Sequence, residues 1–426
     1  MSAVIVTSND GDGSNSNSNS RITSTQKRGN VASLKDENLT AIDTFGNVFN
    51  VPDFSIKDIL QAIPKECYKR SAVKSLSFVL RDILAMVTIG SISYNYIELI
   101  PWKFARFCCW ALNCWLLGLF GTGLWVLAHE CGHQAFSDYG WLNDTVGWIL
   151  HSYLLVPYFS WKFSHGKHHK ATGHLTRDMV FVPATKDEFL AARNVSHLAE
   201  LAEDSPIVAL YELLAQQLGG WLMYLTSNVS GQPYSDVPFW KKNHFVPTAP
   251  LFDKKDYWFI WLSDLGILLQ FLILYKWVNT FGWFNFTVFW FVPYILVNHW
   301  LVFITFLQHS DPTMPHYEAE QWTFARGAAA TIDRDFGFVG KYIFHDIIET
   351  HVLHHYVSRI PFYNGRVGTE AIKKVMGKHY RYSNENMWKS LWKSGRYCQF
   401  VEGENGVKMY RNINGLGVAP ADLQKK

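Results

Sequence analysis

The feature that most constrains this chain is a long run without a charged side chain, FCCWALNCWLLGLFGTGLWVLA at residues 107–128. A helix needs about 20 apolar residues to cross the hydrocarbon core of a bilayer. Similar runs cover residues 257–278 and 284–307, and a weaker one covers residues 79–99. We therefore predict an integral membrane protein with four transmembrane helices.

Composition indicates a large polar part beside these spans. Hydrophobic residues make up 48% of the chain and charged residues only 18%, whereas soluble domains average about 25% charged residues. The mean hydropathy of −0.03 is nevertheless too polar for a protein made mostly of transmembrane helices. These values exclude a disordered chain and a pure channel bundle. The net charge of +3 does not support binding to nucleic acid, and we expect the six cysteines to be reduced thiols rather than a disulfide framework.

The order of the four spans predicts which segments share a side of the membrane. With a cytosolic N-terminus, residues 129–250 and 309–426 both lie on the cytosolic face. The connection at residues 279–283 contains no Lys or Arg, whereas the segment after residue 310 contains many, as the positive-inside rule requires. We predict an all-α fold in which these two segments form a helical cytosolic cap.

Three other segments complete the predicted organisation. The polar tract at residues 1–40 contains no apolar core of a secretory signal, so we expect a disordered cytosolic tail before a single domain at 41–426. The apolar stretches at 145–161 and 207–225 are short or interrupted by polar residues, which favours interfacial helices over further spans.

Histidine is abundant, and eight of the 17 histidines form three clusters. The spacing within each cluster places two or three imidazoles on one face of a helix. A chain of this length and histidine content contains only about 0.03 HxxHH patterns by chance. The topology places all three clusters on one side of the membrane, where they predict a shell for two metal ions, because a structural zinc needs only four ligands. An all-nitrogen shell beside a membrane suggests redox metals that activate dioxygen. The clusters are His129-Glu-Cys-Gly-His133, His165-Gly-Lys-His168-His169 and His351-Val-Leu-His354-His355.

With these motifs the sequence resembles the membrane fatty acid desaturases, in particular the Δ12/ω3 acyl desaturase group of fungi and plants. The resemblance covers nearly the whole chain after about residue 40 and implies a histidine-rich di-iron centre, dioxygen as co-substrate, four spans, two cytosolic termini and a location in the endoplasmic reticulum membrane. The residues that carry it are HECGH at 129–133, HGKHHKATGHLTRDMVFVP at 165–183, NVSGQPY at 228–234, LQHSDPTMPHY at 307–317, and ATIDRDFG with HDIIETHVLHHYVSRIPFYN within 330–364.

The resemblance also implies the residues of the site. The eight cluster histidines (His129, His133, His165, His168, His169, His351, His354 and His355) correspond to iron ligands, and His309 is the candidate for a ninth, although a hydrogen-bonding role is the alternative. Thr305 stands where related enzymes have an Asn that binds through water. The ligand N–H groups need acceptors, and each candidate has the alternative of a solvated charge or a helix cap. These candidates are Glu130, Asp178, Asp311, His345, Asp346 and Glu349.

The activity implied by the resemblance is insertion of a cis double bond into oleate to form linoleate (Δ12). The alternatives are ω3 desaturation of linoleate and hydroxylation of the same acyl chain, and the acyl carrier is either a phospholipid or coenzyme A. The chain has no flavin, nicotinamide or HPGG haem motif, and the resemblance implies that electrons come from separate cytochrome b5, reduced by its NADH-dependent reductase. The basic residues Lys373, Lys374, Lys378 and Arg381 are a candidate docking face, with contact to anionic lipid as the alternative.

Two other functional classes are consistent with parts of the pattern. His129-Glu130-x-x-His133 matches the HExxH signature of zinc proteases, with Glu130 as general base, but that function leaves the other clusters unexplained. A metal transporter would place histidines within the spans, where only His299 is found. Both are weaker hypotheses than a desaturase.

Overall fold

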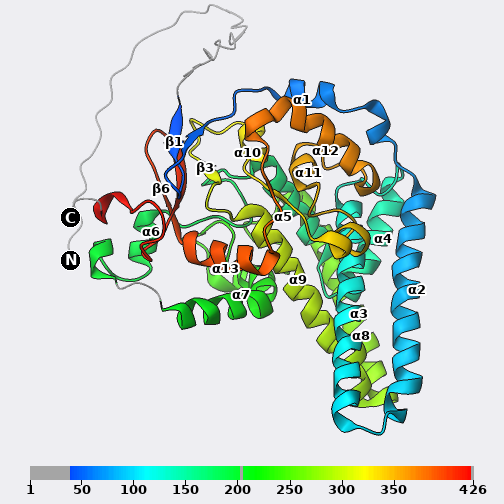
Figure 1. Cartoon of the computed structure of the whole chain (residues 1–426). Helices are drawn as coiled ribbons and strands as arrows, with labels where there is room; N and C mark the ends of the chain where they lie inside the picture. Colours follow the sequence, from blue (N-terminus) through cyan, green and yellow to red (C-terminus); the bar gives the residue numbers. More distant parts are fainter. Residues whose placement is uncertain (1–38, 202–204, 424–426) are drawn as a thin grey trace, which may run out of the picture. The chain divides into compact units, whose positions relative to one another are not determined.

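The computed structural model describes residues 39–201 and 205–423, and this part of the chain is mostly helical (Figure 1). The predicted tail at residues 1–40 falls almost entirely outside the described residues. Strand β1 (Thr40–Ile42) pairs antiparallel with β2 (Val48–Asn50) at the start of the described part. All six cysteines are free, as expected.

Three stretches are long and apolar enough to cross a membrane, and they contain all four predicted spans. The first is α2 (Ala72–Tyr96), which continues through a 3-10 turn to Leu99 and begins where the Ser71 side chain accepts the N–H of Lys74. The second is α3 (Lys103–Gly132), which extends beyond the predicted span and so includes most of the first histidine cluster. The third stretch is Lys254–His309.

The third stretch consists of two helices, α8 (Tyr257–Phe286) and α9 (Val292–His309), joined by a π turn at Thr287–Phe291. Gly282 within α8 has a φ of 81° and a ψ of 166°, a non-helical conformation that glycine adopts without a steric penalty. A straight helix of these 56 residues would be about 84 Å long, against about 30 Å for the bilayer core. The interruption at Gly282 therefore divides the stretch into two segments of spanning length.

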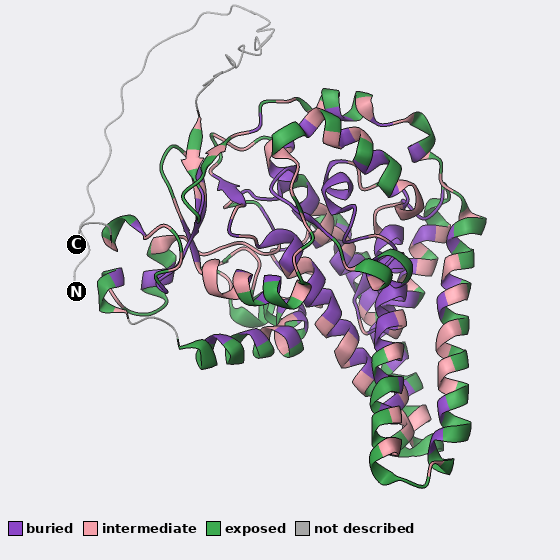
Figure 2. Ribbon diagram, in the orientation of Figure 1, coloured by how far each residue is buried: buried purple, intermediate pink, exposed green. Residues whose placement is uncertain are grey.

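The outward faces of these long helices are apolar. Exposed side chains include Leu80 on α2, Phe107 on α3 and Leu272 on α8, and Figure 2 shows how much of α2 and of the lower part of α3 is exposed. Soluble monomers rarely expose apolar patches of this extent. The chain is a membrane protein whose long helices present this surface to lipid.

The remaining helices surround the ends of α3 and α9. α4 and α5 together cover the stretch predicted at 145–161, and α7 covers that predicted at 207–225. One face of α7 is buried and the opposite face, with Ile207, Tyr211 and Leu218, is exposed and apolar. The helices are α1 (Ile56–Ala62), α4 (Gly140–Tyr153), α5 (Tyr158–Ala171), α6 (Lys186–Ala191), α7 (Pro206–Ser227), α10 (Phe324–Ala328), α11 (His351–Tyr356), α12 (Phe362–Met376) and α13 (Met387–Tyr397), with a π turn at Val339–Ile343.

Small sheets correct the expectation of an all-α fold. β3 (Pro315–Tyr317) and β6 (Phe400–Glu402) flank β7 (Val407–Arg411) in a three-stranded antiparallel sheet, and β4 (Asp333–Arg334) pairs in parallel with β5 (Tyr382–Ser383). The parts of the predicted cap also pack together, because His174 bridges to Tyr317 and Thr185 to Val401.

Helices α3 and α9 approach each other closely because α3 presents glycines to α9. A Cβ atom at Gly118 would lie 2.7 Å from the Cβ of Leu296, and one at Gly121 would lie 2.8 Å from Cγ2 of Val297. Distances below 3.0 Å would force the helices apart. The close packing brings the end of α3, with His129, to the end of α9, with His309.

Candidate metal centre

Nine histidines from four helices converge on one place. The end of α3, the middle of α5, the last residue of α9 and the short helix α11 each contribute. They are the eight cluster histidines and His309, which are His129, His133, His165, His168, His169, His309, His351, His354 and His355.

The convergent nitrogen atoms form two groups. One comprises His129, His133, His165, His169 and His354, and the other His168, His309 and His355, with the ligand atoms of each group within 4.8 Å of one another. The ninth residue, His351, joins the second group, because its Nε2 lies 3.0 Å from Nε2 of His309. Five imidazoles exceed the four ligands of a structural zinc, so two neighbouring metal ions fit this arrangement better than one.

Several ring nitrogens at the centre are buried without a hydrogen-bond partner among the described residues. They include Nε2 of His133, His168, His354 and His355. A buried nitrogen without a partner is costly, and here two such residues, His133 and His354, belong to one group and two, His168 and His355, to the other. The donor set therefore fits metal ions, which would supply the missing partner for each lone pair.

Asp178, one of the predicted acceptors, holds His168 in the required tautomer. Nδ1–H of His168 donates to Oδ1 of Asp178 at 2.5 Å, which leaves Nε2 unprotonated and directed to the centre. The carboxylate is itself fixed by the backbone N–H groups of Gly173, at 2.9 Å, and Val180, at 3.1 Å.

Thr172 does the same for His355, and the sequence did not predict it. The Thr172 hydroxyl donates to the carbonyl of His168 at 2.8 Å, so its oxygen accepts from Nδ1–H of His355 at 3.0 Å. Nε2 of His355 is then free for a metal. Thr172 lies between the second cluster and His174, so its position in the HGKHHKATGH motif was the available signal.

Burial keeps these imidazoles neutral. Burial, together with a smaller effect of the neighbouring His168, lowers the pKa of His354 to about 3. Burial likewise holds the pKa of His165, His169 and His355 well below the ordinary value. A metal ligand must be unprotonated, and the centre provides this at physiological pH.

The other predicted acceptors lie near the centre but contact different groups. Glu130 is buried and accepts the N–H of Phe362 at 3.0 Å, with Oε1 4.0 Å from Nδ1 of its neighbour His129. Nε2 of His345 contacts Oδ2 of Asp82, on α2, at 2.8 Å. Asp346 pairs with Arg366.

Glu349 accepts the N–H of Phe336 at 3.1 Å. Its other oxygen, Oε2, is buried without a partner among the described residues. Burial raises the pKa of this carboxyl to about 7.

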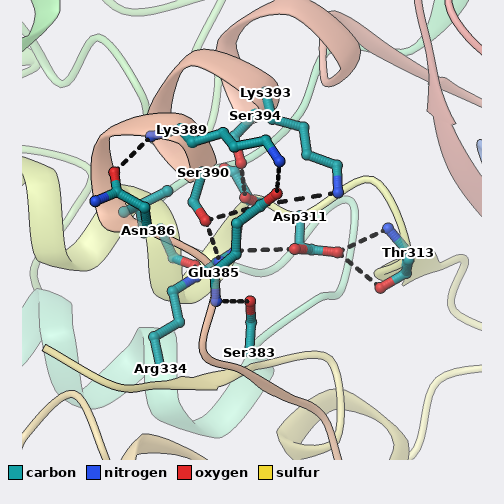
Figure 3. Close-up of polar contacts among 12 residues, drawn as sticks. Asp311, Thr313, Arg334, Ser383, Glu385, Asn386, Lys389, Ser390, Lys393 and Ser394 are labelled. Carbon is teal, nitrogen blue, oxygen red and sulfur yellow. Dashed lines mark hydrogen bonds and ion pairs between the residues drawn. The ribbon is translucent and has the colours of Figure 1, made fainter.

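Asp311 belongs to a separate polar network (Figure 3). Oδ2 of Asp311 accepts from the guanidinium of Arg334 at 2.8 Å, and Oδ1 accepts from the hydroxyl of Thr313 at 2.7 Å. Arg334 also donates to the carbonyl of Leu307 and to the hydroxyl of Ser390. This network joins the end of α9 to α13, so Asp311 supports the helix that carries His309 rather than a histidine ring.

An apolar cavity of about 350 Å³ opens onto the centre. His165, His168 and His309 line part of it, and residues of α7 and α9 form most of its wall. Gly220, Trp221, Met223 and Tyr224 of α7 are among the residues that line it. The remaining lining residues are Trp125, Trp161, Val180, Phe181, Ala215, Gln216, Val229, Ser230, Leu301, Val302 and Thr305.

Aromatic rings cover the histidines on the cavity side. Trp161 stacks on His165 with ring centroids 4.5 Å apart, and Phe181 stacks on His309 at 5.8 Å. Phe181 has a φ of 45°, which is unusual for a residue with a bulky side chain, and such strain collects at functional sites. Trp161 and His165 lie one helical turn apart on α5, whereas the contact between Phe181 and His309 joins residues distant in sequence and was not predicted.

A family comparison agrees with this site. The sequence model described as fatty acid desaturase matches residues 108–386, which include all nine histidines. The chain belongs to the fatty acid desaturase family. As a desaturase-family member it is an oxidoreductase that acts on acyl lipids.

Curated relatives of this desaturase-family chain span nearly its whole length. An oleate hydroxylase of Claviceps purpurea is 48% identical over 417 residues, covering 92% of this chain and 87% of the relative. A Delta(12) fatty acid desaturase of Mortierella alpina is 40% identical over 381 residues, covering 87% and 94%. An omega-6 fatty acid desaturase of Brassica juncea, named for the endoplasmic reticulum, is 40% identical over 366 residues, covering 85% and 92%.

The family and the geometry together argue against the two other hypotheses, a zinc protease and a metal transporter. A zinc protease would use His129 and His133 with one further ligand, but seven more histidines stand beside them. A transporter would place histidines along the spans, whereas the desaturase-family chain gathers them where the long helices end.

Proposed function

We propose that this protein inserts a cis double bond into the acyl chain of oleate at the Δ12 position, with dioxygen as co-substrate. The observation that carries the proposal is the largely apolar cavity that His165, His168 and His309 of the metal centre help to line. Such a cavity suits an unbranched hydrocarbon chain, because most of the side chains that line it are apolar or aromatic. The name of the Mortierella alpina relative supports the Δ12 position.

The nine histidines would hold two iron ions, one in each group. Iron bound there would supply the activation of dioxygen needed to break an unactivated C–H bond. The chain's own residues do the rest. Asp178 and Thr172 keep the lone pairs of His168 and His355 directed inward, and Trp161 and Phe181 cover the histidines and exclude water from the acyl side.

The acyl carrier has a place beside the same cavity. Gln216 lines both the apolar cavity and a more polar cavity of about 370 Å³ that also contains Glu188, Arg193 and Glu212. The polar cavity suits the head of the carrier while the acyl chain lies in the apolar one. The exposed apolar face of α7 beside both cavities supports a substrate that arrives from the bilayer.

The topology proposed for the protein has four spans and two cytosolic termini. The interruption of the third apolar stretch at Gly282 supports four passes rather than three, and with an even number both ends of the chain lie on one side. The endoplasmic reticulum is the proposed location, supported by the name of the Brassica juncea relative. Cytochrome b5, reduced by its NADH-dependent reductase, is the proposed source of electrons.

Hydroxylation of oleate is the second candidate activity. The relative that is 48% identical is named an oleate hydroxylase, whereas the Mortierella alpina desaturase is 40% identical. Both reactions begin with hydrogen abstraction from the same chain, so the same centre and cavity serve either one.

One experiment separates these activities. The protein is expressed in a host that makes only monounsaturated fatty acids, and the products are identified by gas chromatography. Linoleate indicates Δ12 desaturation, a hydroxy acid indicates hydroxylation, and a triene formed only when linoleate is supplied indicates ω3 desaturation. No product from any of these substrates, with protein present in the membrane, would contradict the proposal.

The metal content of the purified protein tests the centre independently of activity. We expect about two irons per chain, since two histidine groups are present. His168→Ala should abolish the product and lower the iron content while the protein stays in the membrane. His197→Ala, at an exposed position outside the centre, is the matched control.

A further inference from the structure

A third cavity, beside the helix α5 that carries the second histidine cluster, is basic. It has a volume of about 400 Å³, and three cationic side chains line it, Lys167, Lys170 and Arg177. Lys170 and Arg177 are exposed. Lys167 pairs with Asp253 at 3.2 Å, so this surface keeps an excess of positive charge.

The basic cavity is separated from the acyl cavity by two crossing segments. The N–H of Val182 donates to the carbonyl of Ser230 at 3.0 Å, and the side-chain amide of Gln232 donates to the carbonyl of Leu175 at 3.1 Å. Val180 and Ser230 face the acyl cavity, whereas Met179 and Gln232 face the basic one. These two contacts therefore lie between the acyl cavity and the basic cavity.

One line of contacts connects the basic cavity to the second histidine group through Asp178. Met179 forms part of the cavity wall. Its neighbour Asp178 accepts Nδ1–H of His168 at 2.5 Å. A single residue thus separates the surface from a metal-facing histidine.

Another line of contacts reaches the same group through Trp322. The guanidinium of Arg177 lies over the ring of Trp322, 5.4 Å from its centre. The indole N–H of Trp322 donates to the carbonyl of Thr172 at 3.0 Å, and the Thr172 hydroxyl accepts from His355. His168 and His355 belong to one group of the centre, so both lines end at the same place.

From this arrangement we propose that the basic cavity is the docking site of an acidic protein that delivers electrons one at a time to the metal centre. The proposal rests on the proposed function, which needs electrons from outside the chain. Positive charge around a concave surface steers an acidic partner to it, and the contacts through Asp178 and through Trp322 and Thr172 carry electrons from the docked partner to His168 and His355. The partner gives up one electron in each encounter, and iron held by His168, His309 and His355 would take it up.

The face predicted from the sequence, at Lys373, Lys374, Lys378 and Arg381, has weaker support. Lys373 pairs with Glu370, and Arg381 donates to the hydroxyl of Thr313 at 2.9 Å. Exposed cations remain at Lys374 and Lys378, which makes them a matched control.

The test uses the full-length protein in detergent or nanodiscs, with the haem domain of cytochrome b5 and its reductase as the probe. The double variant Lys170→Glu/Arg177→Glu should raise the donor concentration for half-maximal activity about tenfold and weaken donor binding by a similar factor. Activity at saturating donor, and single-turnover activity with dithionite, should stay at the wild-type level. For the wild type, the donor concentration for half-maximal activity should rise with salt concentration. For the double variant it should not. Lys374→Glu/Lys378→Glu should match the wild type, and Lys170→Gln should give a smaller shift in the same direction.

The failures are distinguishable. If the wild type forms no product with either reductant, the proposed function is wrong. If the wild type forms product but the cavity variants need no more donor than the wild type for half-maximal activity, the docking site is wrong. It is also wrong if only the variant at Lys374 and Lys378 needs more donor. Loss of the dithionite-driven turnover in Lys170→Gln would also overturn the docking proposal, because the cavity would then act on the chemistry itself.

Discussion

The Nδ1–H of His168 donates to Oδ1 of Asp178 at 2.5 Å, within a carboxylate site that two backbone N–H groups complete. Asp178→Asn keeps the size of the side chain but removes its charge, so the imidazole becomes a weaker base. Changes of this kind typically cost 10–100-fold in metal affinity or activity. We expect a lower iron content in the purified protein and a drop in activity of that order.

The matched control for Asp178 is Asp346→Asn. Asp346 pairs with Arg366, whose side chain is half exposed, and contacts no histidine of the centre. Its iron content should equal that of the wild type. Equal iron content in both variants would show that Asp178 does not support the metal site.

Thr172→Val tests the hydroxyl that accepts from His355. The exchange removes an oxygen from a buried site and leaves Nδ1–H of His355 without its acceptor, a loss worth about 1–3 kcal/mol. Thr172→Ser retains the oxygen and should behave almost as the wild type. Iron content and activity measured together distinguish the two. A Val variant that equals Ser in both would remove Thr172 from the account of the site.

Gly220 tests the acyl cavity from the α7 side. A Cβ atom at this position would lie 3.6 Å from Cγ of Gln216 and 3.7 Å from Cγ1 of Val302, ordinary contact distances. Gly220→Ala should therefore fold well and gain about 0.5–1 kcal/mol of helix stability. Gly220→Leu extends into the cavity and should lower conversion of an 18-carbon substrate at least tenfold.

Gly219→Leu is the control for that series. A Cβ at Gly219 meets nothing within 4 Å, and Gly219 does not line the cavity. Product yield should stay near the wild-type level, as judged by gas chromatography of total lipids. Equal losses at both positions would indicate a general effect on α7 rather than a block of the acyl chain.

Much of this architecture could be predicted from sequence because its signals are local. The uncharged run at 107–128 requires a span, and the HxxHH spacing at 165–169 requires a shared helix face. Counting spans then placed distant clusters on one side, and the structure brings them together. The predictions from sequence were correct where they concerned residues within a single helix.

The remainder depends on contacts between distant segments. Thr172 has no pattern that marks its hydroxyl as the partner of His355, which lies 183 residues further along the chain. Strand β3 has three residues, too few to show an alternating pattern. Asp311 was predicted as an acceptor for a ligand N–H, but its partner is Arg334, which comes from a different element.

Glu349 should make stability depend on pH. Burial raises the pKa of its carboxyl from an ordinary 4.5 to about 7, so the folded state binds more protons than the unfolded state between these values. Its contribution to stability is fully present below about pH 4.5 and is lost as the pH rises through about 7. Thermal unfolding across this range should show Glu349→Gln with a flatter pH profile than the wild type and a higher relative stability at pH 8.

Glu370→Gln is the control for Glu349, since the side chain of Glu370 is 69% exposed. It should follow the wild-type profile. A Glu349→Gln profile parallel to that of the wild type would mean that the carboxyl keeps the same charge in both states.

Arg334 is the last test, because it holds the end of α9 in place through three groups. Its guanidinium donates to the carbonyl of Leu307, to Ser390 and to Asp311, and the side chain is only 4% exposed. Arg334→Met leaves Asp311 charged and largely buried without its cation, a change that costs about 3–5 kcal/mol. Adding Asp311→Asn to Arg334→Met removes the uncompensated charge and should recover part of the loss in unfolding temperature.

Lys389→Ala, on the exposed rim of the same network (side chain 74% exposed), should change stability by less than about 1 kcal/mol. If the double variant is no more stable than Arg334→Met alone, the loss comes from the donors to Leu307 and Ser390, and the ion pair with Asp311 contributes little to holding His309.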